Sequence, residues 1–169
     1  MDKVNFYYIE EGDYAPRENY PWIKRENIAI IVQYKDEYLF LGWNKVNYQN
    51  SLVTGGIDNN EEKESAVIRE LRELREETGF DDIKEIHPVD AINISKFFVE
   101  HKNQNREAIY YPYLVILNSK KQQDIAEEEK KEHSLIWIKK EDLDTIDLFD
   151  NHRYMLNKAI AKEKTLVKS

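Results

Sequence analysis

One amphipathic helix stands between two groups of apolar runs that have the length of β-strands. Short runs rich in β-branched and aromatic residues, bounded by polar turns, predict strands. The runs before the helix are 27–34, 37–43 and 51–56, and those after it are 91–100, 108–118 and 134–138. A closing helix is expected over 149–164. This order predicts an α/β fold in which helices cover the faces of a mixed β-sheet.

The central helix is predicted from its apolar spacing. Val67, Leu71, Leu74 and Thr78 fall within about 60° of one another on a helical wheel, so they form one buried stripe. Gly79 follows directly, where a left-handed cap residue commonly ends a helix.

A second face of the same helix is acidic. Glu70, Glu73, Glu76 and Glu77 lie within about 120° of one another, beside the apolar stripe. Like charges three and four residues apart destabilise a plain helix. The arrangement becomes favourable when a divalent cation binds between the carboxylates, and oxygen ligands of this kind suit Mg²⁺ or Mn²⁺.

The helix also permits a purely structural interpretation. Arg69, Arg72 and Arg75 alternate with the glutamates and could neutralise them through surface ion pairs, each of which contributes little to stability. A glycine pair upstream and the Glu-Glu-x-Gly ending downstream are not needed for a solvated face, so they favour a site.

Composition narrows the functional classes. The net charge of -8 excludes a basic surface for non-specific nucleic-acid binding. The absence of cysteine excludes disulfides and thiolate chemistry. No apolar run approaches the roughly 18 residues of a membrane span, and the first residues lack the apolar core of a secretory signal. We therefore expect a cytoplasmic protein that does not bind membranes.

The length of 169 residues predicts one domain over 1–169. Within it, residues 1–24 are expected to form an N-terminal arm or edge strand. Residues 163–169 are expected to be a frayed tail.

The stretch from the glycine pair to Phe80 resembles the Nudix box of the Nudix hydrolase superfamily. By this resemblance the chain is MutT-like. The box reads Gly, five residues, Glu, seven residues, then Arg-Glu-apolar-x-Glu-Glu-x-Gly-apolar. Residues 72–80 match its second half completely. The order of strands and helices likewise resembles the Nudix α/β/α sandwich, so the resemblance extends over most of the chain.

The two halves of the box are out of step by three residues, which is the length of the repeated Arg-Glu-Leu. Counting back from Arg72 places the box glutamate on Glu64 but puts no glycine at the box position. Counting forward from Gly55 brings Glu61 and Arg69 into register instead. Whether Glu61 or Glu64 pairs with the box arginine is left open.

Carboxylate spacing favours the second copy of the repeat. A site of three carboxylates at i, i+3 and i+4 follows from Glu73, which adds Glu76 and Glu77. The same spacing from Glu70 reaches Leu74 and loses a ligand. We therefore expect Arg72 to belong to the site, and Glu70 to lie one turn upstream without binding the metal directly, although it shares the acidic face.

The resemblance implies an enzyme that hydrolyses a nucleoside diphosphate linked to another moiety, with Mg²⁺ or alternatively Mn²⁺ as cofactor. Its implied metal ligands are Glu73, Glu76, Glu77 and a backbone carbonyl of Gly55 or Gly56. Arg72 would orient the glutamates through a charge-assisted pair. The metal ions would bind the diphosphate and lower the pKa of the attacking water, which explains how an acidic protein binds a polyphosphate.

Other residues are weaker candidates. The general base is Glu76, Glu77 or a carboxylate from the run 127–129, in which Glu128 is central. Lys102 and Arg106 lie in a polar stretch, 101–107, which could be a plain loop or could meet phosphate. The partner is a small nucleoside diphosphate derivative, and an oligomer is possible.

A second function is also compatible with the sequence. A non-catalytic Nudix-fold module could bind a nucleotide, RNA or a protein, and several stretches are similar to Nudix modules associated with leucyl-tRNA synthetases. The complete set of Glu73, Glu76 and Glu77 favours the enzyme, and the displaced glycine spacing favours the module. The sequence does not identify the substrate.

Overall fold

The computed structural model describes residues 4–44 and 49–167. The strands are β1 (Val4–Ile9), β2 (Trp22–Tyr34), β3 (Glu37–Trp43), β4 (Val53–Gly56), β5 (Ile83–Pro88), β6 (Ile92–Val99), β7 (Gln104–Leu117) and β8 (His133–Lys139). The helices are α1 (Lys63–Thr78), α2 (Glu127–Glu132) and α3 (Asp150–Val167), with short 3₁₀ turns η1 (Gly12–Tyr14), η2 (Glu100–Lys102) and η3 (Lys140–Thr145).

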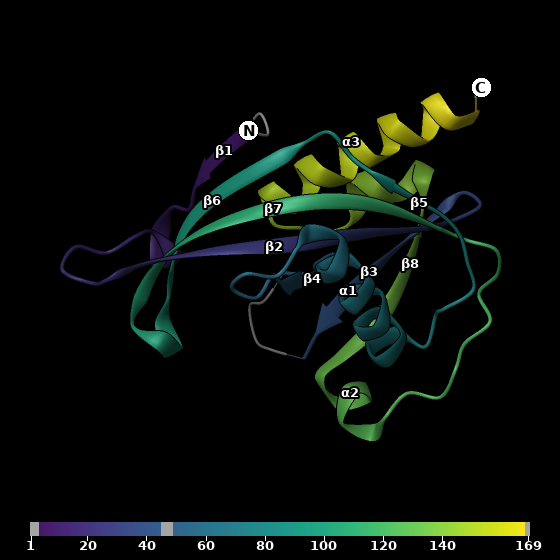
Figure 1. Ribbon diagram of the computed structural model, residues 1–169, viewed down its shortest axis with the longest axis horizontal. Coiled ribbons are helices and arrows are strands. Elements are labelled where there is room, and N and C mark those ends of the chain that lie inside the picture. The colour runs from purple at the N-terminus through teal and green to yellow at the C-terminus, as the bar shows by residue number, and fades with distance from the viewer. Residues whose placement is uncertain (1–3, 45–48, 168–169) are drawn as a thin grey trace.

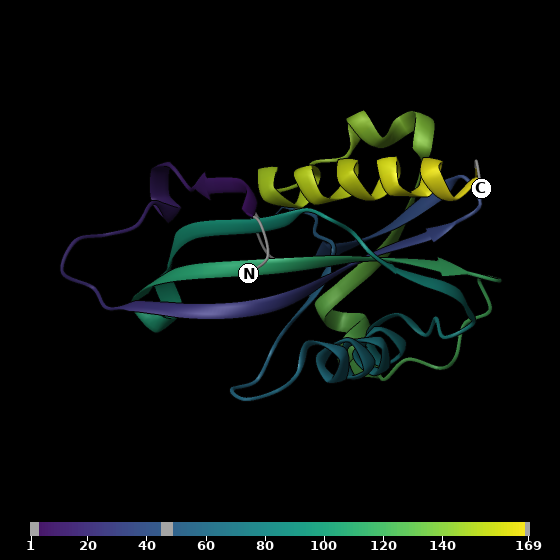
Figure 2. The ribbon, with the colours of Figure 1, turned by 45° about the horizontal axis from the view of Figure 1, so that its top comes forward.

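All eight strands join one mixed sheet, in the order β1-β6-β7-β2-β3-β8 (Figure 1). Outside this path, β4 pairs with β2 and β5 pairs with β7. The two longest strands, β2 and β7, run parallel through the middle of the sheet. Viewed along the sheet, α3 lies on one side and α1 on the other, which confirms the predicted α/β fold with helices on both faces (Figure 2).

β2 supplies side chains to both layers of the core because successive side chains of a strand point to opposite faces. Ala29 and Ile31 pack beneath α3. Ile28, Ile30 and Val32 pack against α1. The continuous apolar run in the sequence is therefore the mark of a strand that is buried on both sides.

Two predicted boundaries are wrong. Residues 104–107, expected in a loop, belong to β7, where they extend the antiparallel ladder with β6. The expected frayed tail from residue 163 is helical, because α3 continues to Val167. Glu163 accepts hydrogen bonds from Tyr38 and Gln33, and Leu166 packs against the core beneath α3. Residues 168–169 lie outside the described ranges.

The N-terminal segment is an edge strand followed by an irregular stretch. β1 pairs in parallel with β6 at the edge of the sheet. Phe6 stacks on Tyr154 of α3 at 4.4 Å between ring centroids. Farther along, Asn105 binds both the backbone N–H and the carbonyl of Arg17 at 2.7 Å. The segment is therefore attached to both the sheet and α3.

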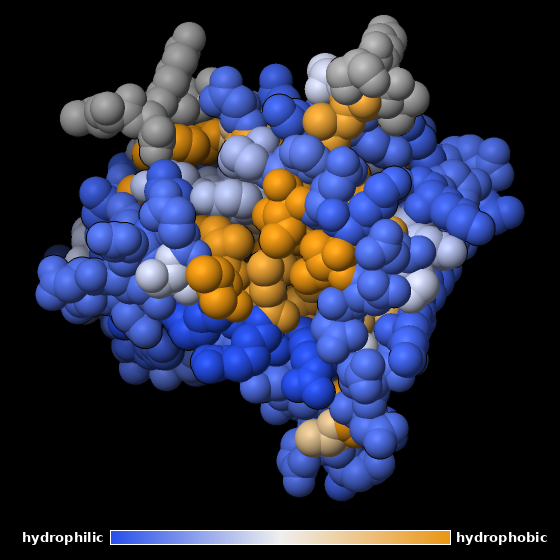
Figure 3. Space-filling view, turned by 45° about the vertical axis from the view of Figure 1, so that its right-hand side comes forward, coloured by the Kyte–Doolittle hydropathy of each residue, from blue (hydrophilic) through white to orange (hydrophobic). Residues whose placement is uncertain are grey.

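One face of the molecule carries an apolar patch. Figure 3 shows apolar side chains gathered at the centre of this face, with hydrophilic side chains around them. No helix in the described ranges is both long enough and apolar enough to span a membrane.

Gly79 ends α1 as predicted, in the left-handed conformation with φ of 82°. Its N–H donates to the carbonyl of Arg75 at 2.8 Å, and its own carbonyl accepts from Gln123 N–H at 2.7 Å. The helix end is thereby joined to the segment that leads into α2. A β-carbon on Gly79 would lie 2.4 Å from the carbonyl oxygen of Gln123.

We expect Gly79→Ala to destabilise the fold more than Gly12→Ala. Gly12 also has a positive φ, 70°, but no atom lies within 4 Å of an added β-carbon. Gly12→Ala should therefore cost only the left-handed strain, about 1 kcal/mol. Gly79→Ala adds a backbone clash and should cost about 2–4 kcal/mol in total. Urea unfolding of both variants measures the difference, and equal losses would contradict the role of the Gly79 contact.

Candidate metal site

Gly55 and Glu70 make the closest contact between β4 and α1. A β-carbon on Gly55 would lie 1.6 Å from Oε2 of Glu70, so only glycine permits this approach. Glu70 is 1% exposed, although it is a carboxylate. The strand and the helix therefore bury an ionisable group between them.

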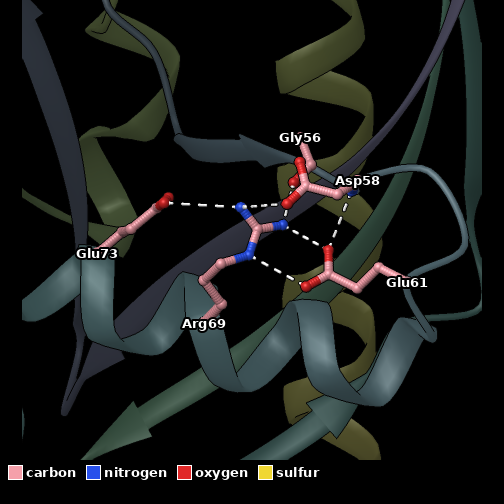
Figure 4. Close-up of polar contacts among 5 residues, drawn as sticks. All are labelled: Gly56, Asp58, Glu61, Arg69 and Glu73. Carbon is pink, nitrogen blue, oxygen red and sulfur yellow. Dashed lines mark hydrogen bonds and ion pairs between the residues drawn. The ribbon is translucent and has the colours of Figure 1, made fainter.

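Arg69 holds the loop after β4 against α1 (Figure 4). Its Nη2 and Nε donate to the two carboxylate oxygens of Glu61 at 2.6 and 3.2 Å. Nη2 also donates to the carbonyl of Gly56 at 2.6 Å. Asp58 and Glu73 lie farther off, each 3.8 Å from Nη1. The bidentate pair between Arg69 and Glu61 lowers the pKa of the Glu61 carboxyl and fixes the loop.

The predicted role of Arg72 in this pair is wrong. Arg72 is exposed and forms no hydrogen bond or ion pair within the described part of the chain. Of the two glutamates that could pair with the box arginine, Glu61 is the one that does so. Glu64 is exposed in the first turn of α1.

The inner face of α1 carries Glu70, Glu73 and Glu77. Glu73 and Glu77 are both close enough to act on the pKa of Glu70. Burial first, and then the interaction with the Glu73 carboxyl group, raise the pKa of Glu70 to about 9. Oε1 of Glu70 is buried and has no hydrogen-bond partner among the described residues. Glu76, predicted as a ligand, is exposed, so it does not join this group.

Leu74 occupies the position four residues after Glu70. It is 0% exposed and packs in the core beneath α1. The next residue on the acidic face is Glu77, one turn beyond Glu73. The inner carboxylates are therefore spaced i, i+3 and i+7 instead of the expected i, i+3 and i+4.

The acidic helix α2 faces Glu77. Burial raises the pKa of Glu77 to about 7, and the charge of Glu129 is the next cause. Glu132 contributes in the same direction, whereas Glu128, the residue singled out from the sequence, is exposed and is not among the causes. His133, which follows α2, forms a 2.9 Å hydrogen bond between Nε2 and the carbonyl of Glu77. Neither Glu132 nor His133 had a spacing that marked it in the sequence.

The donor set fits a divalent cation. Among residues 4–44 and 49–167, no three carboxyl or imidazole groups already converge as a finished metal site. Glu70 nevertheless has a buried oxygen without a hydrogen-bond partner among the described residues, close to a second carboxyl group, that of Glu73. An unpaired buried charge is costly unless a counter-ion or a proton neutralises it. A hard cation with water ligands would meet that need.

A cavity of about 990 Å³ lies on the opposite face of the sheet. Thr54 lines it, and the next residue, Gly55, contacts Glu70, so only the β4 backbone separates the two sites. Asn151 and His152 of α3 form part of its wall. Burial lowers the pKa of His152 to about 4, and its Nδ1 accepts from Leu52 N–H at 3.1 Å. This buried histidine therefore holds the chain just before β4.

The two predicted phosphate ligands are not beside the carboxylates. Lys102 is exposed in η2, in the turn between β6 and β7. Arg106 is half-buried in β7, four residues before Tyr110. Tyr110 packs with the core beneath α3, and strand alternation places Arg106 on that same face.

The model of the NUDIX domain matches residues 23–159, so the chain belongs to the NUDIX domain family. The family predicted from the sequence is thus confirmed, and membership supports the expected enzyme class, a Nudix pyrophosphohydrolase. No curated protein sequence matches the chain.

Solved structures show the same fold at low sequence identity. A protein described as a NUDIX hydrolase from Listeria monocytogenes has a TM-score of 0.62 and 20% identity, over 82% of this chain and 94% of that chain. An Ap4A hydrolase from C. elegans has a TM-score of 0.57 and 17% identity, over 83% and 98%. An E. coli dihydroneopterin triphosphate pyrophosphohydrolase has a TM-score of 0.59 and 15% identity, over 80% and 95%.

The two neighbouring glycines provide a matched test of the Gly55–Glu70 contact. Gly55→Ala should displace Glu70 and cost about 1–3 kcal/mol of unfolding free energy. Gly56→Ala should change stability by less than about 0.5 kcal/mol, because its nearest neighbour would be 3.9 Å away. Chemical denaturation measures both, and a harmless Gly55→Ala would disprove the close approach.

Stability should fall with rising pH when a chelator is present. The pKa values of Glu70 and Glu77 are raised from 4.5 to about 9 and about 7, so the folded chain binds more protons than the unfolded chain between these limits. The free energy of unfolding therefore decreases as pH rises from about 5 to about 9. Thermal melts across this range measure the slope, which Mg²⁺ should reduce.

Glu70→Gln should flatten the profile between about pH 7 and about pH 9, because an amide cannot ionise and the pKa of Glu77 is about 7. Glu64→Gln, on the exposed side of α1, serves as the control and should keep the wild-type slope. A slope that survives between about pH 7 and about pH 9 in Glu70→Gln would show that groups other than Glu70 cause it.

Proposed function

We propose that the chain is a divalent-metal-dependent hydrolase that cleaves the pyrophosphate bond of a nucleoside diphosphate linked to another moiety. The observation that carries the proposal is Glu70, a fully buried carboxylate with an orphaned oxygen, packed on Gly55 and beside Glu73. Family membership supports it. A non-catalytic binding module has no need for such a costly group.

Glu70, Glu73 and Glu77 would hold the metal, together with the backbone carbonyl of Gly55. Mg²⁺, or alternatively Mn²⁺, would bind the diphosphate and lower the pKa of the attacking water. Arg69 acts on the loop that carries the glycine pair, so it is a positioning residue. This assignment replaces Arg72 with Arg69 and Glu76 with Glu70.

Glu77 is suited to accept a proton from water. Its pKa of about 7 lies close to neutral pH, where a general base is most effective. It also faces Glu129 and Glu132 of α2, whose charges contribute to that value. In the metal-free chain the charges of Glu129 and Glu132 add to the effect of burial on the pKa of Glu77, and α2 is not required to supply ligands.

The neighbouring structures and the cavity support a small nucleotide derivative as substrate. Two of the similar proteins are named as hydrolases of Ap4A and of dihydroneopterin triphosphate. The cavity of about 990 Å³ is as large as the pockets that enclose small molecules. Its aromatic wall includes Tyr110 and Phe97, against which a base could stack.

The choice of carboxylates can be tested by single substitutions. Glu70→Gln and Glu73→Gln should each lower kcat roughly 100-fold, because each removes charge that would stabilise the reacting phosphates. Glu77→Gln should also slow turnover strongly. Glu76→Gln is the control, since Glu76 is exposed, and should stay within about threefold of wild type.

The assay is phosphate release with Mg²⁺ over nucleoside triphosphates, dinucleoside polyphosphates, ADP-ribose and nucleotide sugars. A greater loss at Glu76 than at Glu70 would place the site in the second copy of the repeat. If no substrate is hydrolysed and calorimetry detects no Mg²⁺ binding, the hydrolase proposal fails.

A further inference from the structure

Arg106 has an unusual environment for a guanidinium group. Its Nε and Nη2 atoms are buried and have no hydrogen-bond partner within the described ranges. It lies in β7 between Phe97 of β6 and Ile23 of β2, to which it is paired on either side. Buried donors left without partners cost stability, so this group requires an explanation.

A second arginine is close enough to act on Arg106 electrostatically. Burial lowers the pKa of Arg106, and the charge of Arg25 is the next cause. Arg25 is opposite Ala108, two residues from Arg106 on the same face, which is a diagonal neighbour within reach of long side chains. Neither side chain forms an ion pair with a described residue. Two unpaired arginines repel each other, and an anion between them would remove that repulsion.

Both arginines lie on the face of the sheet that carries the large cavity, although neither lines it. Phe97, opposite Arg106, lines the cavity, and so does Tyr110 on the same face of β7. One step farther along β2 on this face is Asn27, which is opposite both Tyr110 and Gly56. The pair is therefore next to the row of residues that leads to β4 and the candidate metal site.

We propose that Arg106 and Arg25 bind a phosphate group of the substrate that does not belong to the bond being cleaved. The substrate class is then a nucleoside diphosphate derivative with an additional phosphate. That phosphate is either a monoester on a ribose or a further unit of the polyphosphate chain. The evidence for an anion site comes from the two arginines alone. The inference that the anion is a phosphate of the substrate rests on the proposed function.

Binding without metal isolates this site from the carboxylates. Calorimetry in EDTA would compare adenosine 3′,5′-bisphosphate with AMP, and adenosine tetraphosphate with ADP. We expect the ligand with additional phosphate to bind about tenfold more tightly in at least one pair, because a charge-assisted contact is gained. The pair that shows the difference identifies the position of the phosphate. Equal affinities in both pairs would overturn the proposal.

Arg106→Gln and Arg25→Gln should each abolish that preference. Arg72→Gln is the matched control, because it removes the same charge from an exposed position on α1, and it should retain the preference. A preference that persists in both Arg106→Gln and Arg25→Gln would also overturn the proposal.

Thermal stability separates binding from a structural role. In the absence of ligand, Arg25→Gln should keep or raise the Tm, because it relieves the repulsion of Arg106. The ligand that shows the preference in calorimetry should raise the Tm of wild type but not that of Arg25→Gln. A lower Tm for Arg25→Gln without ligand would assign Arg25 a structural role and contradict the proposal. This variant changes an exposed residue, so misfolding does not obscure the result.

The two proposals fail separately. If the arginine variants lose the phosphate-dependent binding but no substrate is hydrolysed, the hydrolase proposal is rejected and the anion-site proposal is kept. If the chain hydrolyses a substrate with Mg²⁺ but shows no preference for the additional phosphate, the anion-site proposal is rejected and the hydrolase proposal is kept.

Discussion

The contact between Glu70 and Gly55 is the constraint on which the rest of the site depends. It places a buried carboxylate against a strand backbone, where any larger residue would collide with it. Because the carboxylate lacks a partner for one oxygen, the fold carries a cost that a cation or a proton must offset. Arg69 and Glu61 hold the adjoining loop in place, so the close approach is maintained from both ends of the loop.

β4 connects the two halves of the proposed function. On one side of this short strand, Gly55 faces the carboxylates of α1, and on the other Thr54 lines the cavity beneath α3. Its antiparallel partner, β2, carries Arg25 two residues beyond the pairing with Gly56. Charges of opposite sign thus occupy opposite faces of one sheet, with a single layer of backbone between them.

Much of the fold follows from local patterns. The runs over 27–34 and 37–43 form the two predicted strands. They pair as a hairpin, and Lys35 adopts the positive φ that its two-residue turn requires. Gly79 ends α1 where the pattern placed it. Residues 104–107 did not look like a strand, because their polar side chains acquire strand geometry only through pairing with β6 and β2. β-structure of this kind depends on neighbours that are distant in sequence.

The sequence by itself determined that one helix carries an apolar stripe beside an acidic face, because both follow from residue order and helical period. It also contained the spacing from Gly55 to Glu61 and Arg69 that the structure uses. Only the tertiary structure decided between the two Arg-Glu-Leu copies. Leu74 turns into the core and brings Glu70 against Gly55, so packing across the sheet, which local periodicity cannot express, selects the first copy.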